Sequence, residues 1–433
     1  MRVVTRFAPS PTGFMHIGSV RTALYAWLWA KKNNGSFILR IEDTDKEREV
    51  AGSLKHIIES LKWLSLDWDE GPNVGGPHKP YIQSERLPIY RKYAERLRRA
   101  GHIYADGDAL RFKIPEKKRW HWHDIVHGEL SAGEEALEDF ILIKSNGYPT
   151  YNFAHIVDDI EMEVTHVMRG EEFISSTPKF LSVYEALGVL PPKYATLPHI
   201  LGPSGKKKLS KRDGAKDLLL YKEEGYLPDA FINFLALLGW NPGDDREIFS
   251  RGELIRAFEL ERIQKSGAQM NEEKLDWINK EHLKKLPAEE IKNNILILLP
   301  EELRNEKIIP LIYERISKWG DVKTMLGAGE LDFFIKRPEI KKEKLIYKNA
   351  PAEKISENLK LAVAALKNIS ENNFSHENIK SALTLIAQNL KNRGELLHPV
   401  RYALSGSDKS PDPFIISEIL GKNETIQRLE KAI

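Results

Sequence analysis

The connection between the first predicted strand and the first predicted helix constrains the fold of this chain most. The apolar run Val3–Phe7 predicts a strand, and Ile17–Lys32 has the apolar spacing of a helix. After the turn at residues 33–35, a second strand over Phe37–Ile41 and a second helix over Gly52–Leu64 follow. Strands that alternate with helices are typical of a parallel, doubly wound sheet, so we expect a Rossmann-like α/β fold.

The segment that joins this strand to this helix is suited to binding a phosphate. Pro9 and Pro11 fix the backbone φ angle, and Gly13 tolerates conformations that other residues resist. A helix that begins near His16 offers unpaired N–H groups and a positive dipole end. Gly18 leaves room for a flat group such as an adenine. By itself, the segment is explained equally well as a proline-rich loop with a surface histidine.

A lysine-dense segment lies nearly two hundred residues later. It reads KKKLSKRDG over residues 206–214 and has glycine-containing flanks. Cations at that density repel one another unless an anion lies among them, and lysine suits a departing pyrophosphate. Taken alone, a solvated basic loop is the simpler interpretation. Together, the two segments predict the two sides of one triphosphate site.

Length and composition indicate a multidomain globular protein. A chain of 433 residues suggests about three domains. It has no cysteine, which excludes disulfides and cysteine-ligated zinc, and no apolar run long enough to span a membrane. The first residues lead directly into a strand pattern without a signal peptide, so we expect a cytoplasmic protein. The net charge is only +2, so a polyanion would have to bind a local basic face.

Changes of pattern along the chain predict the domain boundaries. We expect a catalytic domain made of residues 1–75 and 150–215, interrupted by a shortened α+β insertion at 76–149. A helical domain at 216–285 and an all-helical region at 286–433 follow. The elements expected beyond residue 75 are helices at Glu85–Ala100, Thr177–Leu187, Pro228–Leu238, Ala288–Leu299, Asn358–Ile369 and His376–Asn389, strands at Phe153–Val157 and Val164–Met168, an irregular aromatic stretch around Trp120–His123 and a surface loop at Ser405–Pro413.

The motifs as a set resemble the bacterial-type glutamyl-tRNA synthetases, which are class I enzymes. They read RFAPSPTG, HIGS, RIEDTD, YPTYNFA, THVMRGEE and KKLSKRDG, in the order of that family. The resemblance is strong from Val3 to about Trp277 and weaker through the C-terminal helices to Ile433. The family's His-x-Gly-His/Thr motif ends here in Ser19, which keeps a hydroxyl group. The resemblance implies ATP-dependent adenylation of L-glutamate, followed by its transfer to the 3′-terminal ribose of tRNA-Glu.

Recognition of glutamate requires cations for two carboxylates and an acidic partner for one ammonium group. Arg6 and Arg169 end predicted strands, so they fall at the sheet edge where open α/β folds bind ligands. Guanidinium groups bind carboxylates bidentately, and Glu42 is the candidate partner of the ammonium. The alternatives are an ordinary ion pair for Arg6 and Glu42 and a packed aromatic ring for Tyr151. By resemblance, the glutamate pocket comprises Arg6, Ala8, Ser10, Glu42, Tyr151 and Arg169.

The resemblance also implies the nucleotide site and the chemistry. His16, Lys208 and Lys211 are the expected catalytic residues, which stabilise charge on the phosphates without forming a covalent intermediate. Mg²⁺ is expected to accompany ATP, held mainly by phosphates and water. Arg48 and Arg315 are the expected tRNA contacts. The expected ATP-binding residues are His16, Gly18, Ser19, Glu172, Ile200, Leu201, Lys208 and Lys211.

Several polar residues invite other interpretations. Asp124 with three histidines of the insertion could imitate a metal site, and the spacing His123-x3-His127 would suit one helix face. We favour packing or RNA contact for these histidines, which include His121, and expect no structural zinc. For the pair at residues 158–159 we favour a structural or helix-capping role. Phe173 stands where many relatives carry His or Trp, and His155 receives no role.

Three other functions compete with the synthetase. A truncated paralogue that glutamylates a modified tRNA base lacks an anticodon-binding region, whereas helical sequence follows Leu286 here. Glutaminyl-tRNA synthetases usually end in β-barrels. An inactive tRNA-binding regulator would not need His16, Lys208 and Lys211. We expect a monomeric glutamate–tRNA ligase. Whether it also charges tRNA-Gln is left open, because Arg315 aligns only loosely with the arginine that senses the third anticodon base.

Overall fold

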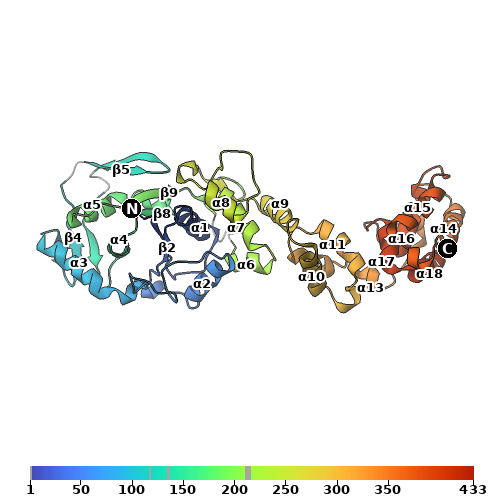
Figure 1. Cartoon of the computed structure of the whole chain (residues 1–433), viewed down its shortest axis with the longest axis horizontal. Coiled ribbons are helices and arrows are strands. Elements are labelled where there is room, and N and C mark those ends of the chain that lie inside the picture. Colours follow the sequence, from blue (N-terminus) through green and yellow to red (C-terminus); the bar gives the residue numbers. More distant parts are fainter. Residues whose placement is uncertain (1, 117–118, 134–136, 210–215) are drawn as a thin grey trace. The chain divides into compact units, whose positions relative to one another are not determined.

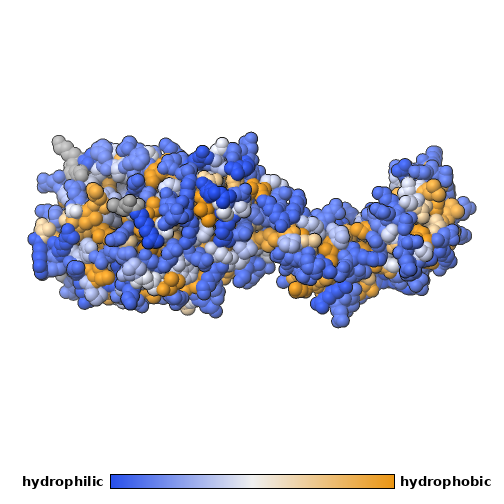
Figure 2. Space-filling model, in the orientation of Figure 1, coloured by the Kyte–Doolittle hydropathy of each residue, from blue (hydrophilic) through white to orange (hydrophobic). Residues whose placement is uncertain are grey.

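The computed structural model describes residues 2–116, 119–133, 137–209 and 216–433. The chain divides into two compact units, Met1–His282 and Leu283–Ile433 (Figure 1). Hydrophilic residues cover most of the visible face of each unit, with hydrophobic patches between them (Figure 2). None of the described helices combines the length and the apolar character that a membrane crossing requires.

A six-stranded sheet forms the centre of the first unit. Its strand order is β2-β1-β8-β9-β5-β6, and every neighbouring pair is parallel except the hairpin of β5 and β6 at one edge. The prediction of a doubly wound parallel sheet is therefore confirmed. The strands are β1 (Val4–Phe7), β2 (Ser36–Leu39), β5 (Arg119–Asp124), β6 (Gly128–Gly133), β8 (His166–Gly170) and β9 (Lys193–Leu197).

Helix α1 (Ile17–Lys32) packs against strands β1, β2 and β8 of the sheet and against helices α7 and α8. Val20, Leu24 and Leu28 are fully buried, on the apolar face that the sequence pattern indicated. The side chain of His16 caps the N-terminus of this helix by accepting from the backbone N–H of Gly18. The other helices of this unit are α2 (Ser53–Trp63), α3 (Leu87–Arg99), α4 (Tyr151–Glu161), α5 (Thr177–Leu187), α6 (Leu218–Glu223), α7 (Pro228–Leu237), α8 (Arg251–Ala257) and α9 (Glu272–Leu283).

The insertion contains an α+β substructure, as the sequence predicted. A three-stranded antiparallel sheet, ordered β3-β4-β7, packs with α3 around the buried rings of Tyr90, Phe112 and Phe140. A separate pair, β10 and β11, joins residues that follow β9 to residues that precede α9. These strands are β3 (Ile103–Asp106), β4 (Ala109–Phe112), β7 (Phe140–Ile143), β10 (Ile200–Leu201) and β11 (Ala268–Gln269).

The strand expected over Phe153–Val157 is wrong, because these residues lie in helix α4. Every residue from 153 to 159 is buried, the polar ones included, and Phe153, Ile156, Val157 and Ile160 have the i, i+3, i+4, i+7 spacing of a helix. Taken alone, Phe153–Val157 is a short and mostly apolar run, which does not distinguish a buried strand from a buried helix. The following strand lies close to its expected place, as β8.

The aromatic stretch around Trp120 is regular, in contrast to the prediction. It forms β5, in which Trp120, Trp122 and Asp124 are buried while His121 and His123 are exposed. This alternation is the period of a strand with one buried face. Because β5 also pairs with β9, the hairpin extends the central sheet.

The second unit is all-helical among the residues it comprises, as predicted. One apolar core lies among α10–α12, around Ile295 and Ile312, and another lies among α14–α18, around Leu359 and Leu383. The helices are α10 (Ala288–Leu298), α11 (Ile309–Arg315), α12 (Gly320–Gly327), α13 (Asp332–Ile335), α14 (Ala352–Lys367), α15 (His376–Ala387), α16 (Gly394–Ser405), α17 (Pro413–Leu420) and α18 (Lys422–Ala432).

Candidate active site

A cavity of about 850 Å³ lies at the carboxyl ends of the parallel strands. Open α/β sheets bind ligands at this edge, and the volume is in the range of small-molecule sites. Leu201 does not line it, Lys211 is outside the described residues, and Arg315 lies in the other unit. The sequence-predicted residues that line the cavity are Arg6, Ala8, Ser10, His16, Gly18, Ser19, Glu42, Arg48, Tyr151, Arg169, Glu172, Ile200 and Lys208.

The start of α1 faces this cavity with a capping box. The backbone N–H of Gly18 donates to Nδ1 of His16 at 3.1 Å, and the N–H of His16 donates to Oγ of Ser19 at 3.2 Å. Because Nδ1 accepts, the neutral imidazole carries its proton on Nε2. A Cβ atom on Gly18 would lie 3.1 Å from Cε1 of His16. The small residue therefore makes room for the histidine ring, and Gly18 also lines the cavity.

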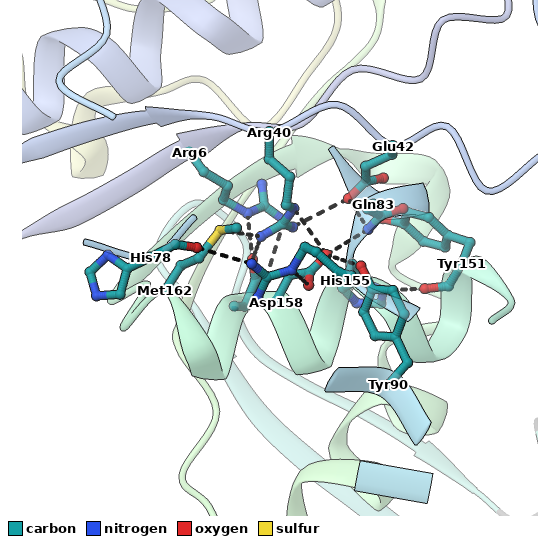
Figure 3. A network of polar contacts seen from close by, with 12 residues as sticks. Arg6, Arg40, Glu42, His78, Gln83, Tyr90, Tyr151, His155, Asp158 and Met162 are labelled. Carbon is teal, nitrogen blue, oxygen red and sulfur yellow. Dashed lines mark hydrogen bonds and ion pairs between the residues drawn. The ribbon is translucent and has the colours of Figure 1, made fainter. Parts of the chain in front are cut away.

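Arginines and carboxylates form a buried network that includes the cavity-lining residues Arg6 and Glu42 (Figure 3). The Nε of Arg6 lies 3.1 Å from Oδ1 of Asp159, and Nη1 of Arg40 lies 2.8 Å from the same oxygen. Burial alone would raise the pKa of Asp159, but the two arginines hold it at about 2. Arg6 also donates to the backbone oxygen of Met168 at 3.3 Å, which ties β1 to β8.

Asp158 connects the same network to the insertion. It accepts from Nε of Arg86 at 2.6 Å, from the hydroxyl of Tyr90 at 2.9 Å and from Nε2 of Gln83 at 2.8 Å. Asp158 and Asp159 lie in the second half of α4, away from its N-terminus. Both are therefore ion-pair partners within the core, and neither caps the helix.

Glu42 lies at the border between this network and the cavity. Its Oε1 is 3.2 Å from Nη2 of Arg40 and 3.5 Å from Nε2 of Gln83. Burial raises the pKa of Glu42 to about 7, and the positive charges of Arg40 and Arg6 only partly offset this effect. A cation that binds next to Glu42 would stabilise its charged form. Glu42 thus forms an ion pair with Arg40, which follows β2, and also lines the cavity.

Arg169 is a buried cation that lines the cavity and is 5% exposed. Its Nη2 donates to Oγ1 of Thr177 at 2.6 Å, and its guanidinium lies 4.3 Å from the ring centroid of Tyr194. Burial lowers its pKa. Among the described residues, no carboxylate oxygen lies within ion-pair distance of it. Because a buried charge without a counter-ion is costly, the geometry indicates a site for an anionic group.

Tyr151 forms the wall between these groups. Its ring stacks on His155 with centroids 4.6 Å apart, and burial raises the pKa of its hydroxyl above the usual value. The hydroxyl therefore stays protonated and can donate a hydrogen bond. Burial lowers the pKa of His155 to about 3, so this ring is neutral and donates from Nδ1 to the backbone oxygen of Tyr151 at 2.6 Å. Tyr151 thus packs against His155 and also lines the cavity.

The charges of the cluster do not balance. Four buried arginines face three buried carboxylates, which leaves an excess positive charge. That excess complements a ligand with one net negative charge, such as glutamate. The members are Arg6, Arg40, Arg86, Arg169, Glu42, Asp158 and Asp159.

The first half of the basic motif is anchored on β10. Lys208 pairs with Leu201 as a β-bridge, and the N–H of Leu209 donates to the oxygen of Ile200 at 2.8 Å. The Nζ of Lys208 lies 3.6 Å from Oε1 of Glu172, and both side chains are about half exposed. Lys208 is thus placed at the rim of the cavity, while Ser210 and Lys211 are outside the described residues.

Sequence reasoning missed several residues of the site. Arg40, Gln83 and Arg86 are buried, and Arg21 on α1 donates to backbone oxygens of Leu238 and Pro198. Arg40 directly follows the apolar run of β2, and a charge at the end of a buried strand was a usable signal. The other three lie in polar or helical surroundings that gave no such signal.

The histidines of the insertion do not share a helix face, so the premise of the metal alternative is wrong. His123 is on β5, where its Nδ1 lies 2.7 Å from Glu129, and His127 is in the turn after β5. No group of three or more metal-binding side chains occurs in the part of the chain that the structure describes.

Comparisons with known proteins agree with this geometry. The family model "tRNA synthetases class I (E and Q), catalytic domain" matches residues 2–109 and 106–277, and "Anticodon binding domain" matches 268–433. A glutamate–tRNA ligase of Dehalococcoides mccartyi (strain CBDB1) is 39% identical over 481 residues, covering 100% of this chain and 97% of the relative. One of Clostridium kluyveri is 39% identical, covering 100% and 98%.

A solved structure has the same fold over the full length. The crystal structure of a glutamate tRNA ligase from Elizabethkingia meningosepticum, in complex with its amino acid, matches with a TM-score of 0.89 and 34% identity. The match covers 100% of this chain and 99% of that chain. This protein therefore belongs to the glutamate–tRNA ligase family of class I tRNA synthetases.

Proposed function

We propose that the cavity binds L-glutamate and ATP, joins them into glutamyl-adenylate and passes the glutamyl group to the 3′-terminal ribose of tRNA-Glu. The observation that carries this proposal is Arg169, a buried cation that lines the same cavity as Glu42 and the start of α1 and has no carboxylate within ion-pair distance among the described residues. Arg169 and Glu42 offer opposite charges to an amino acid, and the helix start suits the phosphates of a nucleotide.

In the proposed complex, Arg169 binds a carboxylate of glutamate and Glu42 accepts its ammonium. Arg6 contributes a second positive charge. It does so at a distance and not by a bidentate contact, because Asp159 already accepts from its Nε and one Nη nitrogen. Tyr151 donates its hydroxyl, and Ala8 and Ser10 line the floor. A glutamine would place a neutral amide where the excess positive charge of the cluster favours a carboxylate.

In the first step, the α-carboxylate of glutamate attacks the α-phosphate of ATP in line, and pyrophosphate leaves. His16 and the first turn of α1 stabilise the phosphate oxygens, while Lys208 and Lys211 stabilise the departing pyrophosphate. Mg²⁺ would bind mainly to phosphates and water, because the carboxylates of Asp45 and Glu172 at the cavity face Arg48 and Lys208.

In the second step, the terminal ribose hydroxyl of the tRNA attacks the carbonyl of the adenylate and AMP leaves. Class I resemblance implies the 2′-hydroxyl, and the resemblance to the glutamyl-tRNA synthetases implies that tRNA binds before the first step. We assign the acceptor end to residues 76–149 with Arg48, the stem to 216–285 and the anticodon to 286–433 with Arg315. We expect the protein to act as a cytoplasmic monomer.

Aminoacylation with labelled glutamate and separate tRNA-Glu and tRNA-Gln transcripts tests the proposal. The proposal requires glutamylation of tRNA-Glu, and its absence would refute it. Labelled glutamine should not be attached to either transcript. Glutamylation of tRNA-Gln would identify a non-discriminating enzyme and remove the anticodon role assigned to Arg315.

A further inference from the structure

His56 on α2 connects two segments that are far apart in the sequence. Its Nδ1 lies 3.2 Å from the backbone N of Met15, and its Nε2 lies 2.6 Å from Oδ1 of Asp217. The ring of Phe14 stacks on the imidazole, with centroids 4.7 Å apart and an interplanar angle of 16°. The residue that precedes His16 is therefore held by the side chain of another helix.

These contacts define which nitrogen of His56 carries the proton. The N–H of Met15 can only donate, so Nδ1 must accept and the neutral ring is protonated on Nε2. That proton then points to the carboxylate of Asp217. Both ring nitrogens are in use, which is why the nearly buried ring is satisfied in the neutral form.

Asp217 completes the arrangement from the other side. It caps α6 by accepting from the N–H of Leu219 at 2.9 Å, and the N–H of Leu218 donates to the backbone oxygen of Met15 at 3.1 Å. Asp217 also pairs with His16 as a β-bridge. The backbone of Met15 is thus fixed at its nitrogen by His56 and at its oxygen by α6.

We propose that His56 is a positioning residue for the adenylation step, which fixes Met15 and thereby the place of His16 at the start of α1. His56 is not among the described residues that line the cavity, whereas Phe14, Met15 and His16 are. It therefore acts through the backbone and touches no reacting atom. The inference rests on the proposed function, because it assigns His56 to the ATP side of that reaction.

Two substitutions separate the two contacts of the ring. His56→Asn carries an amide oxygen near the position of Nδ1, so it can accept from Met15 but is too short to reach Asp217. His56→Gln can reach Asp217 but cannot accept from Met15 at the same time. Asp217→Asn keeps an oxygen for the Nε2 proton and for the cap of α6.

The test is ATP–pyrophosphate exchange with L-glutamate and tRNA-Glu, with kcat and both KM values measured. For His56→Ala we expect the KM for ATP to rise about tenfold, since the hydrogen bond from His16 or the start of α1 to a charged phosphate of ATP is displaced. We expect kcat to fall by up to about 10²-fold, since misplacement by 1 Å has that effect. The KM for glutamate should stay within about twofold, because the glutamate contacts come from other elements.

His56→Asn should recover most of the loss, His56→Gln less, and Asp217→Asn should stay near the wild type. His78→Gln is the matched control, since His78 lies 2.8 Å from Glu70 in a similar pair outside the cavity. Wild-type kinetics for His56→Ala, or equal increases of both KM values, would overturn the inference. Absence of exchange in the wild type would instead refute the proposed function.

Discussion

Arg6 and Asp159 stand 153 positions apart in the sequence, yet the Nε of Arg6 lies 3.1 Å from Oδ1 of Asp159 in a buried ion pair. The pair joins the end of β1 to the second half of α4. Because Arg40 shares the same carboxylate, one side chain of α4 orients two cations below the cavity. The place of the proposed glutamate site is therefore set by a residue that does not line the cavity.

Asp159→Asn should destabilise the first unit strongly. The substitution leaves Arg6 and Arg40 buried without that negative charge, and breaking a buried ion pair costs about 3–5 kcal/mol. Asp229→Asn is the control, since Asp229 pairs with Arg251 near the surface and such pairs contribute at most about 1 kcal/mol. Urea unfolding at pH 7 measures both; equal stability of the two variants would contradict the role given to Asp159.

The contribution of Asp159 should also depend on pH. Its pKa in the folded protein is about 2, below the unfolded value of about 3.9. The unfolded chain therefore binds more protons between these values, so the stabilisation is present above about pH 4 and is lost as the pH falls toward 2. The difference in unfolding free energy between wild type and Asp159→Asn should shrink over this interval. A difference that stays constant would argue against the ion pair.

Glu42 should make glutamate binding dependent on pH near neutrality. Burial raises its pKa to about 7, so at pH 6 the free enzyme holds a proton that must leave before the carboxylate accepts the ammonium. The KM for glutamate should fall by about fivefold as the pH rises from 6 to 7 and by about a further twofold up to pH 8, where it levels off. Pyrophosphate exchange from pH 6 to 8 measures this slope. Glu42→Gln should bind weakly and without the slope, and an unchanged slope in that variant would exclude Glu42 as its source.

Loss of the charge of Arg169 should mainly lower glutamate affinity, whereas loss of the charge of Arg6 should mainly lower stability. Arg169→Met removes a buried cation that has no ion-pair partner in the described part of the chain, so glutamate affinity should fall by about 10–10²-fold while the thermal midpoint is largely kept. Arg6→Met breaks the pair with Asp159 and should lower the midpoint clearly. Differential scanning calorimetry with and without glutamate compares them. A large loss of stability in Arg169→Met would show that its charge is balanced within the protein.

Lys208→Ala should slow pyrophosphate exchange by about 10²–10³-fold and leave the KM for glutamate unchanged. Its half-exposed contact with Glu172 predicts no measurable change in stability. Lys206→Ala removes an equal charge from the same segment and should have little effect. Lys211→Ala, outside the described residues, should resemble Lys208→Ala. Full activity in Lys208→Ala and in Lys211→Ala would show that the basic motif takes no part in the mechanism.

The helices with clear ends were predictable from the sequence. Ile17–Lys32 and Thr177–Leu187 have the same bounds in the structure, because a capping residue precedes the first and Gly188 follows the second. Helix α4 was missed because Phe153–Val157 alone is a short apolar run, and its helical period becomes visible only when the segment is extended to Ile160. The strand period of β5 was visible and was overlooked.

The site was predictable to the extent that it lies in short motifs. Arg6, Glu42 and Arg169 are placed together because strands of a parallel sheet end at one edge. The partners that orient them were not predictable, since Asp159 meets Arg6 and Arg40 only through the packing of α4 against the sheet. A single sequence, read by itself, contains no signal for such long-range pairs. The same holds for the contacts of His56 with Met15 and Asp217.

The most direct test of the account is the exchange of labelled pyrophosphate into ATP by the purified protein, with tRNA-Glu present and one amino acid added at a time. The account predicts exchange with L-glutamate, and none above background with L-glutamine or L-aspartate. Exchange with glutamine at a similar rate, or none with glutamate, would contradict the claim that the excess positive charge around Arg169 selects glutamate for adenylation.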